Sequence, residues 1–259
     1  MTAGEDHSTQ KEIALDLARQ VDIRNKVFLF DIDGVLNESQ QPLSDIMQRT
    51  LQRLTRHFPV YFVTGNPYTK TVDILNGSIA HFSGVFCNNA DELRTMRGKL
   101  MWYDDETPPI PVRIEDTLRH LLVMTGGDHA GNRIEWRNPR MLNYSHIGRF
   151  ASSDMRKAHD ASWRHETIDY LKIAYPMVEA VAGGSISLDI YSRGADKSRA
   201  AKFINNMGKD FVFIGDKTEE GGNDYPVKKY CEEHKQNLTL TSYGTKHTME
   251  LIETVLGRI

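Results

Sequence analysis

Short apolar segments recur along the chain, and each ends abruptly at an acidic or small polar residue. Residues 27–31 read VFLFD, residues 60–66 read VYFVTGN, and residues 211–216 read FVFIGD. Continuous apolar runs of this length are typical of strands that are buried on both faces of a parallel sheet. Segments with helical spacing separate them, such as residues 44–58, where Ser44 is a suitable N-cap. This alternation predicts an α/β fold built on a parallel sheet.

The middle of the chain has a different pattern. Residues 92–103 predict a hairpin, residues 153–174 predict one long helix, and residues 185–192 alternate like a half-buried strand. The first pattern then returns with another helix and strand. We therefore expect an α/β core domain of residues 1–91 and 196–259, interrupted by an α+β insert of residues 92–195.

An amphipathic segment precedes the first strand. In residues 11–21, the apolar side chains Ile13, Leu17 and Val21 repeat at helical spacing. We expect a helix that leads into the first strand and packs this stripe against the core domain.

Composition excludes two classes of partner. The 259 residues carry 32 Lys and Arg against 35 Asp and Glu, a net charge of −3, so no basic field is available to attract nucleic acid. No segment of the sequence is apolar for long enough to span a bilayer. The two cysteines, Cys87 and Cys231, and the absence of a signal-peptide pattern predict a reducing, cytoplasmic location. Any phosphate chemistry must then rely on local charge.

The polar residues that end the predicted strands are candidates for one site. In a parallel sheet the carboxyl ends of the strands meet at one edge, where ligands bind. Asp31, Asp33, Thr64, Asn88 and Asp216 are expected there, although they are far apart in sequence. Crowded carboxylates repel unless a cation lies between them, and oxygen ligands suit Mg²⁺. Taken alone, Asp33 could be an acidic turn residue and Thr64 a turn hydroxyl, but the matching strand ends favour a Mg²⁺ site that handles phosphate.

Four segments, DIDGV, VTGN, ADKSRAAKFI and FIGDKTEEGGND, resemble in order and spacing the four motifs of the haloacid dehalogenase superfamily of phosphotransferases. The resemblance implies a Rossmann-like parallel-sheet core with an inserted α+β cap of type C2. It also implies that Asp31 attacks phosphorus and forms an aspartyl phosphate, while Asp33 exchanges a proton with the leaving and accepting oxygens. Thr64 would hold a phosphoryl oxygen, and Lys197 would neutralise negative charge. Read separately, Lys197 could be a surface lysine at the start of a helix.

The same resemblance assigns a Mg²⁺ site. Asp31, the Asp33 carbonyl and Asp216 would hold the ion. Asn223 and Asp224 would be further ligands, or would support the ligands from outside. Read separately, the GGND stretch that contains these two residues could be a simple turn.

Within the predicted insert, EWRNPRMLNYSHIGRFASSDMRK and GGSISLDIYSRGADK resemble the cap of eukaryotic-type phosphomannomutases. With the core motifs, this resemblance covers most of residues 26–224. It implies that cap arginines hold the phosphate that is distant from the reacting one, because a planar guanidinium binds phosphate oxygens in pairs. Arginines in a polar insert could otherwise be solvated surface charges. The residues assigned to substrate binding are Gly65, Asn66, Arg137, Asn143, Arg149, Arg156, Ser187 and Asp189.

Enzymes of that family interconvert mannose 6-phosphate and mannose 1-phosphate. A phosphorylated aspartate donates to either sugar phosphate, a hexose 1,6-bisphosphate forms and turns around, and its other phosphate returns to the aspartate. The resemblance therefore implies a phosphomannomutase that uses Mg²⁺, a phosphorylated hexose as substrate and a hexose 1,6-bisphosphate as activator. It also implies a homodimer formed through the cap.

Several positions depart from the family pattern. Val35 replaces a threonine, Gln40 replaces an arginine that contributes to substrate phosphate binding, and Asn88 and Asn89 belong to a stretch that has a carboxylate in the family. These changes keep two alternatives open. One is a Mg²⁺-dependent phosphatase of a sugar phosphate or another small phosphate ester, and the other is a non-catalytic phosphosugar-binding protein. The intact acidic motifs argue against the second.

Overall fold

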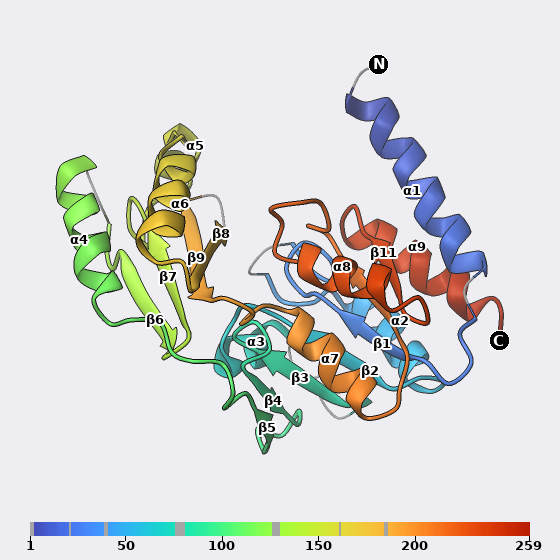
Figure 1. Cartoon of the computed structure of the whole chain (residues 1–259). Coiled ribbons are helices and arrows are strands. Elements are labelled where there is room, and N and C mark those ends of the chain that lie inside the picture. The colour runs from blue at the N-terminus through green and yellow to red at the C-terminus, as the bar shows by residue number, and fades with distance from the viewer. Residues whose placement is uncertain are drawn as a thin grey trace. The chain divides into compact units, whose positions relative to one another are not determined.

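The structure is a computed structural model that describes residues 3–20, 22–38, 41–75, 81–125, 130–160, 162–183 and 186–259. Gln40 lies outside the described residues. The chain forms two compact units, which are coloured by residue number in Figure 1. The larger comprises Met1–Tyr103, Lys197–Glu220 and Asp224–Ile259, and the smaller comprises Asp104–Asp196 with Gly221–Asn223. Within the described ranges, no helix combines the length and the apolar character needed to cross a membrane.

The larger unit is built on a mixed sheet with the strand order β11-β10-β1-β2-β3-β4-β5. Its parallel strands are β1 (Val27–Phe30), β2 (Val60–Val63), β3 (Gly84–Cys87), β10 (Phe211–Gly215) and β11 (Leu238–Thr241). Strand β1 lies between two parallel neighbours, with Leu29 opposite Tyr61 of β2 on one side and Phe213 of β10 on the other. The parallel-dominated sheet confirms the α/β fold class.

Helices cover both faces of this sheet (Figure 1). Phe28 and Phe30 pack in one cluster with side chains of α2 (Asp45–Thr55), α3 (Tyr68–Leu75) and α9 (Thr245–Leu256). Leu29 and Phe213 pack in another with α7 (Ser198–Asn206) and α8 (Tyr225–Glu233). Full burial of each such side chain stabilises the fold by about 1.5–3 kcal/mol. The strands are therefore apolar on both faces, and polar residues appear only where they end.

Helix α1 (Ala3–Gln20) packs against α9 and β11. Its docking face is made by the small side chains of Ala14 and Ala18, which are buried. Ile13 and Leu17 are 47% and 40% exposed, so the prediction that these residues form the docking stripe is wrong. Val21 lies outside the described residues. Alanines let the two helix backbones approach closely, which explains why they face the core.

The hairpin of β4 (Glu92–Arg94) and β5 (Leu100–Tyr103) belongs to the larger sheet. Strand β4 pairs antiparallel with β3, with Glu92 opposite Cys87. The structure therefore differs from the prediction that the insert begins at residue 92, because the smaller unit begins at Asp104. The chain turns back directly after β3, so the hairpin extends the edge of the sheet already formed.

The smaller unit is built on an antiparallel sheet with the strand order β6-β7-β9-β8. These strands are β6 (Ile134–Asn138), β7 (Met141–Ser145), β8 (Val178–Ala182) and β9 (Ser187–Ser192). Leu142, Tyr144 and Leu188 share a buried cluster with α4 (Ile114–Thr125) and α6 (Trp163–Ala174). Since side chains alternate along a strand, Asn143 and Asp189 lie on the opposite face.

The predicted helix over residues 153–174 is wrong in one respect, because it is divided into α5 (Ser153–Ala158) and α6. His159 leaves the helical conformation, with φ −75° and ψ 122°. Asp160 Oδ1 then accepts a hydrogen bond from the Ser162 backbone N–H at 2.9 Å. This local side-chain bond competes with helix continuation and explains the break.

Candidate active site

Polar residues that follow parallel strands lie at one edge of the large sheet. Asp31 follows β1, Thr64 follows β2, Asn88 follows β3 and Asp216 follows β10. The Asp31 N–H still donates to Ile214 O of β10 at 2.9 Å, so the loop begins within the sheet's hydrogen-bond pattern. The topology thus brings together residues that are distant in sequence, as predicted.

Lys197 forms ion pairs with two buried carboxylates. Its Nζ lies 2.8 Å from Asp31 Oδ1 and 2.8 Å from Asp224 Oδ1, and the side chain is 1% exposed. Burial by itself lowers the pKa of a lysine, but Asp224 and then Asp31 outweigh it and raise the pKa of Lys197. Lys197 is therefore a fixed positive charge beside the Asp31 carboxylate.

Three carboxylates crowd together around this lysine. Asp31, Asp216 and Asp224 each offer a carboxylate oxygen, and these atoms lie within 4.8 Å of one another. Burial, followed by repulsion from Asp224, raises the pKa of Asp31 to about 8, although Lys197 acts in the opposite direction. Burial and Asp224 also raise the pKa of Asp216. The ionised forms of Asp31 and Asp216 are therefore disfavoured unless further positive charge is added at the cluster.

The donor set fits Mg²⁺. Among the described residues, Asp216 Oδ1 is buried without a hydrogen-bond partner. Gly34 has a positive φ of 85°, and a Cβ at this position would clash with Asp216 Oδ2. The glycine of the DIDGV segment therefore leaves room for this carboxylate. A small divalent cation that prefers oxygen ligands would bind the unpartnered Asp216 Oδ1 and would offset the repulsion among the three carboxylates.

Asp224 acts in the structure as a support for the cluster. Its Oδ1 accepts from Lys197, and its Oδ2 accepts from the backbone N–H groups of Asp216 and Lys217 at 3.0 and 3.2 Å. Both oxygens are thus used to hold the lysine and the turn after β10. Asn223 directly precedes it, and the Asn223 Oδ1 is buried without a partner among the described residues. Of the two roles left open for Asp224, the contacts favour support of the metal ligands.

Asp33 is held by the turn after β2. Asn66 Nδ2 donates to Asp33 Oδ2 at 2.7 Å, and the Asn66 backbone N–H donates to Thr64 Oγ1 at 3.1 Å. Gly65 lies between them in the chain and is partly exposed. The sequence predicts Asn66 as a substrate-binding residue, whereas its amide group contacts the predicted acid/base.

Most of the predicted cap residues lie on the polar face of the smaller sheet. Asn143 of β7 is opposite Asp189 of β9, and Asn143 Nδ2 donates to Asp189 Oδ1 at 2.7 Å. Arg149 Nη1 donates to Asn143 Oδ1 at 2.6 Å. Ser187 lies on this face at the start of β9, opposite Ser145. The sheet therefore fixes a row of hydrogen-bonding groups beside an arginine.

Glu135 joins the two arginines of this face. Its Oε1 lies 2.5 Å from Arg137 Nη1, and its Oε2 lies 3.0 Å from Arg149 Nε. Burial, and then the Arg149 charge, lower the pKa of Arg137. Glu135 is not among the site residues predicted from the sequence. Its position two residues before Arg137 in the same strand, and hence on the same face, was the available signal.

Arg156 supports the loop that carries Arg149. Its Nε donates to Ala151 O at 2.9 Å, and its Nη2 donates to Arg149 O at 2.8 Å. Arg137 and Arg149 thus form ion pairs with the same glutamate, Glu135, whereas Arg156 donates to backbone carbonyls. These contacts fix the position of the Arg149 backbone.

His146 and His159, which lie on either side of Arg149 in the sequence, contact each other through their rings. Protonation of this histidine pair is expected to destabilise the smaller unit. His146 Nδ1 lies 3.2 Å from His159 Nε2, and the His146 ring stacks on Trp163 with centroids 4.6 Å apart. Burial, and then His159, lower the pKa of His146 to about 4, and burial also lowers the pKa of His159. The unfolded chain therefore binds protons at these rings more readily than the folded chain. The free energy of unfolding should fall as pH falls from about 6.5 toward 4.

Thermal melting followed by circular dichroism at pH 7.5 and pH 5 tests this expectation. His146→Phe keeps an aromatic ring against Trp163 but does not titrate, so it should show a smaller loss of melting temperature in acid. His120→Phe, at an exposed position on α4, is the matched control and should follow the wild type. An unchanged acid sensitivity in His146→Phe would show that the pair does not carry the effect.

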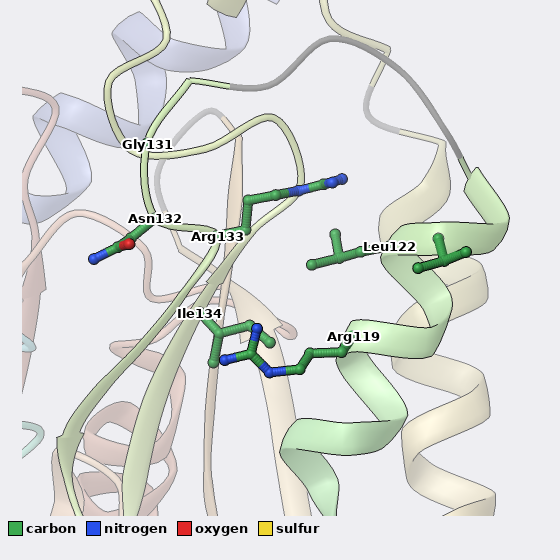
Figure 2. A pocket seen from close by; sticks show the side chains of 7 residues that line it. Arg119, Leu122, Gly131, Asn132, Arg133 and Ile134 are labelled. Atoms are coloured by element: carbon green, nitrogen blue, oxygen red, sulfur yellow. The ribbon is translucent and has the colours of Figure 1, made fainter.

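A cavity of about 490 Å³ lies between α4 and the start of β6. Figure 2 shows Arg119 and Leu122 reaching from α4 toward the segment that contains Arg133 and Ile134. The residues that line it include none of the predicted site residues. Val123, which also lines it, is 78% exposed. This region of the smaller unit is therefore an apolar surface with two arginines.

Comparisons with known proteins agree with the geometry. The family model described as eukaryotic phosphomannomutase matches residues 47–257, a range that begins after Asp31 and Asp33. A phosphomannomutase of Spinacia oleracea is 28% identical over 236 residues, covering 83% of this chain and 90% of that protein. A phosphomannomutase of Saccharomyces cerevisiae is 30% identical over 217 residues, covering 77% and 83%.

Solved structures show the same fold. A haloacid dehalogenase-like hydrolase from Bacteroides thetaiotaomicron aligns with a TM-score of 0.60 at 14% identity, covering 90% of this chain and all of that chain (100%). An IMP-nucleotidase from Plasmodium falciparum aligns with a TM-score of 0.68 at 13% identity, covering 96% and 72%. The long family match and the curated relatives together decide the classification. The chain belongs to the eukaryotic phosphomannomutase family.

Proposed function

We propose that this chain is a Mg²⁺-dependent phosphomannomutase that interconverts mannose 6-phosphate and mannose 1-phosphate. The observation that carries the proposal is the pairing of Asp31 with Lys197 inside a carboxylate cluster, in a chain that belongs to the phosphomannomutase family. A buried lysine that stays charged beside a carboxylate supplies the fixed positive charge that phosphoryl transfer requires.

The chemical steps use the side chains at the strand ends. Asp31 attacks the phosphorus of a hexose bisphosphate in line, its carboxylate oxygen forms a bond to phosphorus, and the bond to the sugar oxygen breaks. Asp33 gives its proton to that oxygen and later takes a proton from the acceptor hydroxyl. Thr64 and Lys197 hold the phosphoryl oxygens. Bound Mg²⁺, held by Asp31, the Asp33 carbonyl and Asp216, would neutralise the charge that develops on the phosphoryl group.

The polar face of the smaller unit supplies the grip on the second phosphate. Arg137 and Arg149 would bind its oxygens, and Asn143, Ser187 and Asp189 would bind sugar hydroxyls or orient the arginines. A mutase needs such a grip because the bisphosphate must turn around and be held equally well by either end. We assign residues 104–196 as the cap that provides substrate specificity, and a hexose 1,6-bisphosphate as the activator that first phosphorylates Asp31.

Transfer is tested by ³¹P NMR with mannose 1-phosphate, glucose 1,6-bisphosphate and Mg²⁺. We expect the mannose 6-phosphate resonance to grow at the expense of mannose 1-phosphate. Arg149→Ala should weaken this conversion strongly, whereas Arg119→Ala, which removes an exposed ion pair with Glu115, should leave it intact. Release of inorganic phosphate without mannose 6-phosphate would contradict the proposal and would favour the phosphatase alternative. That alternative is motivated by Asn88 and Asn89, which depart from the family pattern.

Assembly and location complete the proposal. We propose a homodimer formed through the smaller unit, because two apolar side chains at the end of α4 are largely exposed. Val123, which lines the cavity of Figure 2, is 78% exposed, and Met124 is 72% exposed. Light scattering that gives the mass of one chain would contradict it. We also propose a reducing, cytoplasmic compartment, because Cys87 and Cys231 are free, buried thiols.

A further inference from the structure

The turn that follows β3 has a strained backbone. Asn88, Asn89 and Ala90 have φ values of 52°, 57° and 60°, so three successive residues that are not glycine adopt the left-handed conformation. Each residue with a Cβ is disfavoured there, and asparagine is the least disfavoured of the ordinary residues. Strain of this kind persists only where the surrounding structure enforces it, and it is concentrated at functional sites.

Contacts on both sides enforce the turn. The Asn89 carbonyl accepts from Arg199 Nη2 at 2.9 Å, and Arg199 Nη1 lies 3.2 Å from Asp91 Oδ1. Arg199 is 7% exposed, and Asn88 and Asn89 are 6% and 3% exposed. The turn is therefore clamped by a buried arginine from the first turn of α7, one residue beyond Ser198.

The left-handed segment of residues 88–90 holds the loop after β2 by two backbone hydrogen bonds. The Asn88 N–H donates to Asn66 O at 3.1 Å, and the Asn89 N–H donates to Thr64 O at 2.9 Å. In this way two successive amide groups point at the backbone on either side of Gly65. A right-handed or extended turn would direct these N–H groups elsewhere.

The loop so held presents its side chain to the acid/base. Asn66 Nδ2 donates to Asp33 Oδ2 at 2.7 Å, while the Asn66 backbone N–H donates to Thr64 Oγ1 at 3.1 Å. Asn66 is thus fixed at its N–H by Thr64 and at its carbonyl by Asn88. Its amide group can set the rotamer of Asp33 only because both backbone ends are held.

We infer that Asn66 is a positioning residue for Asp33, and that the left-handed turn of residues 88–90 exists to hold it. The inference rests on the proposed function, in which Asp33 protonates the leaving sugar oxygen. Its consequence is specific: a substrate whose leaving group needs no proton should not depend on Asn66. The sugar phosphates, whose alkoxide leaving groups do need one, should depend on it.

The experiment compares two leaving groups in Asn66→Ala and Asn66→Asp. The second variant is nearly isosteric and lacks the N–H donor. Steady-state conversion of mannose 1-phosphate with glucose 1,6-bisphosphate reports the proton-dependent reaction. The burst of p-nitrophenolate from p-nitrophenyl phosphate reports transfer of phosphate to Asp31 without need of an acid. Asn205→Ala is the control, because Asn205 makes its side-chain bonds at the far end of α7.

We expect kcat for the sugar phosphate to fall roughly 10- to 100-fold in both Asn66 variants, with KM within about twofold, since general acid–base catalysis contributes about 10²–10⁴-fold in all. The p-nitrophenolate burst should stay within about threefold of the wild type. Ala90→Val, which places a β-branched side chain in the left-handed turn, should reproduce this selective loss if it folds, and Asn205→Ala should match the wild type in both assays.

Three outcomes would overturn the inference. They are an equal loss in both assays, a change in KM alone, and no change in either assay. A change in KM alone would instead support the substrate-binding role predicted from the sequence. If the wild type releases phosphate from mannose 1-phosphate but forms no mannose 6-phosphate, the mutase proposal fails, yet the comparison of leaving groups still tests Asn66.

Discussion

Asp31→Asn is expected to lower phosphoryl transfer by about 10⁴- to 10⁶-fold, the range found when single residues of a catalytic triad are removed. The amide oxygen is a poor nucleophile, and no aspartyl phosphate can form at this position. The protein should remain folded, because Lys197 keeps its ion pair with Asp224 at 2.8 Å. Burial and repulsion from Asp224 disfavour the ionised form of Asp31 and raise its pKa to about 8, and asparagine removes this unfavourable charge. The metal-free variant should therefore melt at the same temperature as the wild type or higher.

The measurement pairs the ³¹P assay with thermal melting of metal-free protein. Asp22→Asn is a suitable control, because Asp22 is exposed and bonded to Arg24. It should change neither activity nor, by more than a degree or two, the melting temperature. Residual activity of Asp31→Asn above about one per cent would contradict the assignment of Asp31 as nucleophile.

Lys197→Met should destabilise the fold by about 3–5 kcal/mol, the usual cost of leaving one partner of a buried ion pair unpaired. Methionine nearly fills the volume of the lysine stem but leaves Asp31 and Asp224 buried without their shared cation. The loss should appear as a lower urea midpoint with an unchanged slope. Mg²⁺ should restore part of it, since a divalent cation offsets the same negative charge.

Lys228→Met provides the contrast. Lys228 is partly exposed and lies 3.5 Å from Glu219, so its loss should cost less than about 1 kcal/mol. If Lys197→Met and Lys228→Met had equal midpoints, the buried lysine would not hold the carboxylate cluster together. Activity alone would not distinguish these cases, because Lys197 also faces the phosphoryl group in the proposed mechanism.

The sequence predicted the strand-end cluster well, for a topological reason. Once β1, β2, β3 and β10 are parallel neighbours, the residues that follow them must meet at one edge. Asp31, Thr64 and Asp216 needed no further information. The division of labour within the cluster did need the structure. Asp224 accepts hydrogen bonds from Lys197 and from two backbone N–H groups. These contacts depend on the conformation of the turn after β10, which the residue pattern does not predict.

Other features were missed because they depend on contacts between distant segments. The hairpin of β4 and β5 has the same local pattern whether it joins the large sheet or the insert, and its pairing with β3 decides the matter. The docking face of α1 was misassigned because Ala14 and Ala18 carry little hydrophobic signal, although small side chains suit close helix packing. Glu135 was overlooked because its ion pair with Arg149 forms only when the fold brings the two residues together.

Mapping of the phosphorylated residue tests the central claim most directly. Protein treated with glucose 1,6-bisphosphate and Mg²⁺ is quenched, reduced with borohydride, which converts an aspartyl phosphate to homoserine, and digested for mass spectrometry. We predict homoserine at position 31, and none in Asp31→Asn. Homoserine at another position, or its absence while the enzyme forms mannose 6-phosphate, would contradict the account.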